Sequence, residues 1–291
     1  MSVPRYALLD PVKDHQEIVK WMMIHTWRFD LVRSIEIALL KTFALPEIAK
    51  ILVDSTEFLG RTQKRYDDTD LLLSLFIENG YSSREGMEAL RRVNRMHARH
   101  PITNHQMLYV LTTFVVEPIL WVREFGWREL STLEQQALFH FWIAVGKRMG
   151  IQDLFGNLDE MLAYHERYEE ERMVYSDNNA SLYHGVLPVV RKMMPFPLGY
   201  VAGSALPGIM SERMCATFGI QPMARLGRGL IRAVLKVRGH ISRGLPLRPQ
   251  YRTEIKRPSY PEGFSIKELG VSGAREPAAM PAVAEVKAEE S

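Results

Sequence analysis

The chain has 291 residues, of which 46% are hydrophobic, 10% aromatic and 24% charged. This composition is typical of a globular protein and argues against a disordered, collagenous or low-complexity chain. The single cysteine, Cys215, excludes an intrachain disulfide framework, a cysteine-based zinc site and a cysteine-ligated iron–sulfur cluster. It also favours a reducing compartment. Any metal or cofactor chemistry therefore falls to His, Asp, Glu and Arg side chains.

The net charge of +3 is distributed unevenly along the chain. Residues 272–291 hold two basic and four acidic residues, a contribution of −2, so the remaining chain carries +5. Small residues, proline and glutamate dominate this tail, which predicts disorder. Residues 225–257 hold ten Lys and Arg against one acid, Glu254. Such a stretch can bind anionic lipid, nucleic acid or a cofactor's acidic groups, but a solvated helix face is the commoner explanation.

Signals for secretion or membrane insertion are mostly missing. The N-terminal residues 1–17 contain no apolar run after a basic start and do not resemble a secretory signal. The strongest apolar run, residues 107–122, contains Glu117 and Pro118 and falls short of the ~20 residues that a spanning helix needs. It is therefore predicted to be a buried core helix. The expected location is cytoplasmic, with at most peripheral membrane contact.

Helix signals follow one another from residue 14 to about residue 243. Each predicted start carries a side chain that can cap the first turn of a helix. These starts are Asp14, Ser82 with Glu85 ahead of a segment ending at Pro101, Asn104 ahead of helix 105–125, Ser131 with Glu134 ahead of a helix that stops at Gly150, and Asn157 with Glu160. A last helix is predicted from Pro222 to Arg243.

These patterns predict an all-α fold, with a single helical domain of about ten helices over residues 1–271 and the tail 272–291 after it. Alternating apolar and polar residues, the mark of strands, are nearly missing. We find no dinucleotide-binding fingerprint, P-loop or internal repeat. The helices 105–125 and 131–150 have the widest apolar faces and are expected to form the core.

Most cofactor sites of helical proteins can be excluded from the residues present. A di-iron carboxylate site needs paired Glu-x-x-His motifs, and no glutamate has a histidine three residues later. A c-type haem needs two cysteines, and Cys215 lacks the glycine-rich surroundings of a thiolate haem ligand. Metalloprotease HExxH and hydrolase GxSxG patterns are also missing. What survives is haem held by a histidine.

The best candidate for such a ligand is His97, in the string RRVNRMHARH near the end of a helix predicted over 83–100. A neutral imidazole binds iron through Nε2 while its Nδ1–H is held by a hydrogen-bond acceptor. Nearby arginines can pair with the haem propionates. On spacing alone, however, a lone histidine near a helix end is more often a surface or capping residue.

Several segments, in their order and spacing, resemble the oxygenase family of latex clearing protein and the MpaB-type oxygenases. They are GRTQKRYDDT (60–69), RMHARHPI around His97, MLYVLTTFVVEPILWVREFGWREL (107–130), FHFWIAVGKRMGIQDL (139–154) and YRTEIKRPSYPEGFSI (251–266). The resemblance covers about residues 15–266 and is closer to the MpaB-like members. It implies an all-helical fold with a globin-like core and a b-type haem. It also implies use of dioxygen to cleave a carbon–carbon double bond in an isoprenoid chain.

The resemblance also assigns roles to individual positions. His97 matches the proximal haem ligand, and Arg65 and Thr69 match a catalytic Arg-x-x-x-Thr pair beside the haem. Arg99 is expected to reach a haem propionate if the chain bends. Asp68 stands where some rubber oxygenases have a lysine that caps iron on the distal side, and an aspartate is not suited to that role. No glutamate aligns with the base of the rubber enzymes, although Glu47 and Glu57 lie nearby.

Simpler interpretations exist for the same residues. Arg65 would be solvated, and the Thr69 hydroxyl would bond to its own backbone. His100 is expected to support the site or lie at the surface, and His140 to be a hydrogen-bonded core histidine. The aromatic residues Phe139, Phe141 and Trp142 are expected to be core packing.

The function that the sequence favours is a haem b-dependent oxygenase acting with dioxygen on a small lipophilic substrate. An apolar channel lined by residues such as Leu108, Phe114 and Trp142 is expected to hold that substrate. Two alternatives remain open: a haem-binding protein without oxygenase turnover, and a cofactor-free helical module that attaches to membrane or nucleic acid through residues 225–257. Nucleic-acid binding is not expected under the favoured hypothesis, and the oligomeric state is left open.

Overall fold

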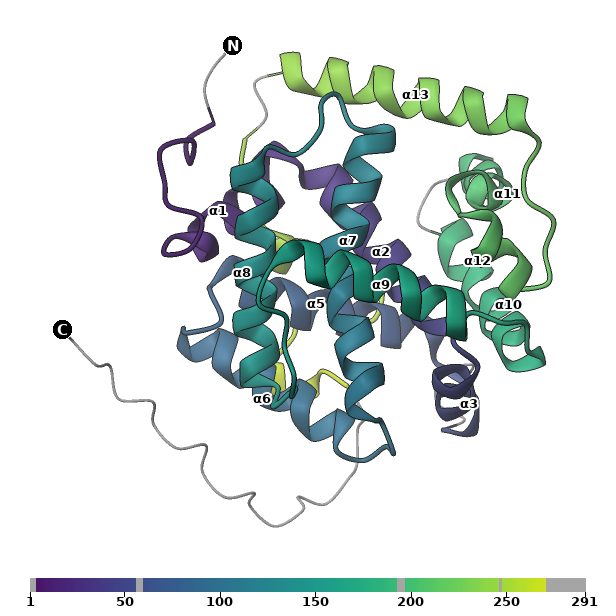
Figure 1. Cartoon of the computed structure of the whole chain (residues 1–291), viewed down its shortest axis with the longest axis horizontal. Helices are drawn as coiled ribbons and strands as arrows, with labels where there is room; N and C mark the ends of the chain where they lie inside the picture. The colour runs from purple at the N-terminus through teal and green to yellow at the C-terminus, as the bar shows by residue number, and fades with distance from the viewer. Residues whose placement is uncertain (1–3, 56–59, 193–196, 246–247, 271–291) are drawn as a thin grey trace.

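The computed structural model describes residues 4–55, 60–192, 197–245 and 248–270. These residues form twelve α-helices, a short π-helix and two 3₁₀ turns, and no strand occurs among them (Figure 1). The all-α prediction is confirmed. The predicted boundary at residue 271 stays a prediction, because the tail 272–291 lies outside the described residues.

The centre of the molecule is the packing of α2 (Arg28–Phe43) against α7 (Asn104–Phe125). The helix α8 (Thr132–Arg148) packs on α7, and α1 (His15–Trp21) packs on α8. A five-residue π-helix, Met22–Thr26, joins α1 to α2. α7 is long and apolar enough to cross a membrane, but 72% of its most apolar stretch is buried inside the molecule. It is a core helix, as the sequence predicts.

A second pair of helices, α5 (Thr62–Glu78) and α6 (Arg84–His97), packs side by side. The helix α9 (Leu158–Arg172) crosses α7 on another side. In Figure 1, α9 runs in front of α7. Tyr168 of α9 stacks on Tyr109 of α7, and the Tyr109 hydroxyl donates to Glu169 of α9 at 3.0 Å.

The remaining helices form one side and one edge of the molecule. α10 (Asp177–Lys192) packs against α3 (Pro46–Asp54) and α11 (Leu198–Ile209), and the short α12 (Glu212–Thr217) follows. The last helix, α13 (Arg225–Gly244), contacts α11 and α7, and its Arg232 pairs with Glu124 near the C-terminal end of α7. Figure 1 shows α13 lying along the upper edge.

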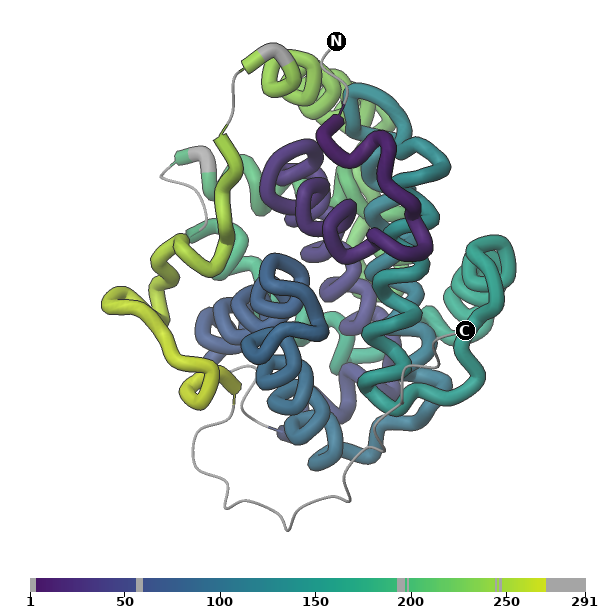
Figure 2. Tube along the Cα trace, turned by 90° about the vertical axis from the view of Figure 1, so that its left-hand side faces the viewer, coloured from purple at the N-terminus to yellow at the C-terminus, as the bar shows by residue number. Residues whose placement is uncertain are grey.

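The C-terminal segment 251–270 returns along the face formed by α5 and α6 (Figure 2). Both oxygens of Asp70 on α5 accept from arginines of this segment, Arg252 at 2.7 Å and Arg257 at 2.5 Å. Gly270 adopts a left-handed φ of 84° and lies so close to Met96 that an added Cβ would sit 2.3 Å from its sulfur. The segment is therefore fixed against the helix that ends in His97.

The predicted helix starts are mostly found, with shifts of a few residues. Ser131 and Asn157 accept from the backbone amides of Glu134 and Glu160, as expected. The predicted caps Ser82 and Asn104 are wrong by one residue, because Ser83 and Thr103 accept the free amides of α6 and α7 instead. Asn104 bonds to the backbone of Gln152 and so fixes the loop after α8. Asp14 makes no capping bond, and α13 begins at Arg225 rather than Pro222.

Candidate active site

A cavity of about 920 Å³ lies between α2, α5, α6, α7, α10, α11 and α13. This volume is at the upper end of the range for small-molecule and cofactor pockets, roughly 300–1,000 Å³. Its wall consists mainly of aliphatic and aromatic side chains with a few charged groups near the end of α6. Such a lining suits a large apolar molecule held by a small number of polar contacts.

His97 lies on the wall of this cavity as the last residue of α6. Burial, followed by the positive charge of Arg65, lowers the pKa of His97 to about 4. Its Nδ1 atom is buried and has no hydrogen-bond partner among the described residues. The acceptor expected for Nδ1–H is therefore not found in this part of the chain. At neutral pH the imidazole is uncharged and has a lone pair available for a ligand.

Arg65 and Thr69 also line the cavity, one turn apart on α5. Because α5 packs against α6, the Arg65–Thr69 face and His97 border the same space. The Thr69 hydroxyl donates to the carbonyl oxygen of Arg65 at 2.9 Å, as the simpler interpretation expects, while its lone pairs remain able to accept. The Arg65 guanidinium makes no ion pair within the described residues.

Arg99 and His100 follow α6 and complete this polar end of the cavity. Both line it, although Arg99 is also exposed to solvent. The structure thus brings together all the residues that the sequence assigns to the site: His97, Arg65, Thr69 and Arg99.

Of the three residues predicted to line an apolar channel, two line the cavity. Phe114 and Trp142 line the cavity and stack with ring centroids 4.4 Å apart. Leu108 is buried in the core and does not line the cavity, because it lies on another face of α7. Phe139 and Phe141 are core residues as expected, but His140 is only half-buried, with its ring 6.4 Å from that of His15.

Two carboxylates line the cavity, Asp68 and Glu36. Asp68 is buried, with its Oδ2 2.9 Å from Lys64 Nζ, and accepts from the Tyr260 hydroxyl at 2.5 Å. It therefore secures the C-terminal segment. Glu36 on α2 accepts from Tyr66 at 2.6 Å and from Arg33 at 2.7 Å, and burial raises its pKa. Sequence reasoning missed Glu36, which lies far from the motif.

The two glutamates that the sequence placed near the site do not contribute to it in the described structure. Glu47 lies on α3, is half-exposed, and pairs loosely with Arg172 at 3.6 Å rather than lining the cavity. Glu57 lies outside the described residues.

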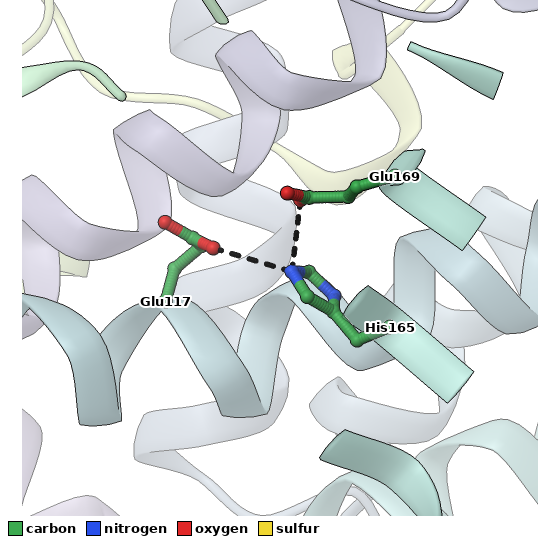
Figure 3. A group of neighbouring side chains, drawn as sticks. All are labelled: Glu117, His165 and Glu169. Atoms are coloured by element: carbon green, nitrogen blue, oxygen red, sulfur yellow. Dashed lines mark ion pairs between the residues drawn. The ribbon is translucent and has the colours of Figure 1, made fainter. Parts of the chain in front are cut away.

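A second polar group was missed entirely: the Lys41 cluster, formed by Lys41, Glu117, His165 and Glu169. Figure 3 shows three of its members, Glu117, His165 and Glu169. Lys41 Nζ lies 2.6 Å from Glu117 Oε1 and 2.5 Å from Glu169 Oε1. His165 Nε2 lies 2.9 Å from the same Glu169 oxygen, and its Nδ1 is 2.8 Å from the Thr112 hydroxyl. All four cluster members are buried, and none lines the cavity.

Three members of this cluster, Glu117, His165 and Glu169, have ligand atoms within 4.8 Å of one another, as a metal site would need. The Lys41 ammonium, however, contacts both carboxylates and supplies the positive charge between them. Burial opposes ionisation of Glu169, but the His165 hydrogen bond and the Lys41 charge lower its pKa to about 2. The arrangement is thus a buried ion-pair cluster that joins α2, α7 and α9.

One local signal could have found part of this cluster. His165 and Glu169 are spaced i, i+4 on one face of α9, whereas the sequence search looked only for Glu-x-x-His. Glu117, a charge within the most apolar helix, is a second such signal.

A family profile described as "ER-bound oxygenase mpaB/B'/Rubber oxygenase, catalytic domain" matches residues 21–240. The chain belongs to this family. Its resemblance to latex clearing protein and the MpaB-type oxygenases, inferred from the motifs around Arg65 and His97, is thereby confirmed. The family is one of oxygenases, which supports an oxidoreductase role.

The sequence identity to individual members of the family is low. The chain is 28% identical over 169 residues to the ER-bound oxygenase mpaB of Penicillium roqueforti (strain FM164), covering 52% of this chain and 57% of that protein. It is also 28% identical to ER-bound oxygenase mpaB of Penicillium brevicompactum, covering 43% of that protein. The chain therefore spans about half the length of the curated relatives it matches.

The fold is also similar to the structure of latex clearing protein in the closed state. The TM-score is 0.54, with 14% sequence identity over 87% of this chain and 71% of the other. At this identity the likeness shows a shared fold, in agreement with the all-α architecture.

Proposed function

We propose that the protein is a haem b-dependent oxygenase that uses dioxygen to cleave or oxidise a carbon–carbon double bond of an isoprenoid-like or other unsaturated lipophilic substrate. One observation carries the proposal. His97, neutral at pH 7, lies on the wall of a large apolar cavity beside Arg65, and within the described residues neither its buried Nδ1 nor the Arg65 charge has a partner. Membership of an oxygenase family supports it.

The residues present fit a haem. An uncharged imidazole on the cavity wall is the donor that haem iron requires. Arg65 and Arg99 on the same wall supply the cations that propionate groups seek. In this proposal His97 holds the iron, and Arg99 pairs with a propionate. Haem supplies the iron centre at which dioxygen is activated.

The other lining residues bind and orient the reactants. The Arg65 guanidinium and the Thr69 hydroxyl stabilise negative charge that develops beside the iron site, because both groups are fixed on one face of α5. Phe114 and Trp142 pack against an apolar chain and exclude water. Glu36 Oε1, held by Tyr66 and Arg33, places a carboxylate on this wall where it can exchange a proton.

The test is a visible absorption spectrum of the purified protein reconstituted with haem, oxidised and dithionite-reduced. We expect a Soret band in the wild type and its loss or shift in His97→Ala. The exposed His105→Ala serves as the matched control and should keep the wild-type spectrum. A wild type without a Soret band, or a His97→Ala spectrum identical to the wild type, would contradict the proposal.

A haem-binding protein without turnover is the second candidate. Asp68 favours it, since the carboxylate at the distal-lysine position is committed to Lys64 and Tyr260. Oxygen consumption with an isoprenoid or unsaturated lipid separates the two: uptake that depends on Arg65 supports the oxygenase, and none with an intact Soret band supports a haem carrier or sensor.

The cofactor-free binding module is the weakest of the three. Its basic segment 225–257 does not form one continuous face, because Arg252 and Arg257 are paired with Asp70 and Arg238 is paired with Asp30. A cytoplasmic location with peripheral membrane contact stays part of the proposal. Relatives described as ER-bound support the membrane contact.

A further inference from the structure

An uninterrupted stripe of exposed apolar side chains runs along α13. Its members follow one another at intervals of four, four, three, four and four residues, the spacing that places side chains on one face of a helix. They are Leu226, Leu230, Val234, Val237, Ile241 and, at the C-cap, Leu245, and each is between 53% and 91% exposed. Exposed apolar residues are normally scattered, so a stripe of this length marks an interaction surface.

The other sides of α13 are already defined by contacts and charge. One side packs on the body of the molecule, where Arg238 pairs with Asp30 at 2.7 Å and Gly239 lies against Trp127. The helix carries six Lys and Arg and no acid, and exposed basic residues such as Arg225 and Arg243 lie away from the stripe. An apolar face with a basic polar face is the pattern of helices that lie in a membrane interface.

The cavity opens beside this stripe. Leu230 and Val234 of α13 and Val201 of α11 line the cavity, yet they are 66%, 58% and 62% exposed. A side chain that borders a cavity and is also exposed to solvent marks its mouth. One mouth of the cavity therefore lies between α11 and α13, which pack together at the edge of the molecule seen in Figure 1.

We propose that the α13 stripe docks on a bilayer containing anionic lipid, and that the mouth between α11 and α13 admits the lipophilic substrate directly from that bilayer. The substrate part of this inference rests on the proposed oxygenase function. The charge of α13 favours a lipid surface over a second copy of the chain. A second copy would bring two basic helices without acidic residues together, whereas anionic headgroups neutralise the basic side chains of α13. Nucleic acid would leave the apolar stripe uncovered.

The first test measures flotation of the full chain with phosphatidylcholine vesicles, with and without phosphatidylserine. We expect binding that needs phosphatidylserine, weakens with salt, and falls about tenfold or more in the double variant Leu226→Ser/Ile241→Ser. Neither residue lines the cavity, so the haem spectrum of this variant should equal the wild type. Leu8→Ser, at a 98% exposed site outside α13, is the matched control and should bind normally.

Three outcomes would overturn the proposal. They are no flotation of the wild type with either vesicle, equal flotation of the double variant and the wild type, and a dimer in light scattering that the double variant dissolves. The last result would assign the stripe to a second copy. Because flotation needs neither haem nor substrate, its failure leaves the Soret test untouched, and a missing Soret band leaves the docking result untouched.

The second test concerns the mouth. Val201→Trp adds bulk where the cavity opens and should slow transfer of a lipophilic fluorophore from vesicles into the protein several-fold, while vesicle binding stays unchanged. A transfer rate equal to that of the wild type would overturn the mouth assignment. Val174→Trp, at a 56% exposed site outside the cavity lining, controls for the added side chain.

Discussion

Removing the ammonium of the Lys41 cluster should destabilise the protein strongly, and more so at higher pH. In Lys41→Met, the buried carboxylates of Glu117 and Glu169 lose a cation that lies within 2.6 Å of each. Breaking a buried ion pair costs about 3–5 kcal/mol. We therefore expect the free energy of unfolding at pH 7 to fall by about 4 kcal/mol and the melting temperature by roughly 10 °C.

The pH dependence follows from the two carboxylates that remain. Without Lys41, one of them should keep a proton in the folded state, so its pKa rises above its unfolded value. A carboxyl group whose folded pKa is raised loses stabilisation as pH rises through that range. The deficit of Lys41→Met relative to the wild type should therefore shrink as the pH is lowered from 8 to about 5.

Urea unfolding followed by circular dichroism at several pH values measures both effects. Lys50→Met is the matched control, because Lys50 pairs with Asp54 at the surface with both side chains at least 60% exposed. It should cost no more than about 0.5 kcal/mol. A Lys41→Met deficit below about 1 kcal/mol, or one that does not change with pH, would refute the ion-pair description of the cluster.

Three further predictions test other contacts. Burial opposes ionisation of Glu134, but hydrogen bonds from Arg128 and neighbouring groups outweigh it and lower its pKa, so the carboxylate stabilises the fold above pH 4.5 and less as pH falls. In urea titrations, Glu134→Gln should lower the free energy of unfolding by about 2 kcal/mol at pH 7. Below pH 4.5 the difference between this variant and the wild type should become smaller. Asp70→Asn should free the C-terminal segment and speed trypsin cleavage after Arg252, whereas exposed Asp54→Asn should not; equal cleavage rates would contradict this. Thr69→Val should keep its melting temperature within a few degrees, because its hydroxyl donates to a backbone carbonyl, yet should lower oxygen uptake; unchanged uptake would exclude a role for the hydroxyl.

Sequence patterns predicted the features that depend only on residues close together in the chain, such as helix caps. Ser131 caps its helix as expected because a capping box needs only residues three apart. Arg65, Thr69 and His97 were placed at one site by spacing and resemblance, and α5 and α6 are adjacent in both chain and space. The shift from Asn104 to Thr103 shows the limit of such patterns, since both residue types can cap.

Contacts between distant helices could not be obtained in this way. Lys41, Glu117 and His165 lie on three helices, and the local signals at Glu117 and His165 do not say which other helices they meet. Which charges neutralise one another depends on how α2, α7 and α9 cross. Leu108 and Phe114 likewise both belong to the apolar part of α7, and only the packing decides which of the two meets the cavity.

The cavity has different chemistry at its two ends, and this polarity has a consequence for the reaction. His97 and Arg65 lie at the end formed by α5 and α6, whereas Leu230 and Val201 line the mouth between α11 and α13. A lipophilic chain that enters at the mouth meets a wall of mainly aliphatic and aromatic side chains. Desolvating a charged or strongly polar group on the way costs free energy, so the double bond of a long apolar chain reaches His97 more readily than a polar head does. The proposed preference for apolar chains over polar ones thus follows from the mainly apolar lining of the cavity.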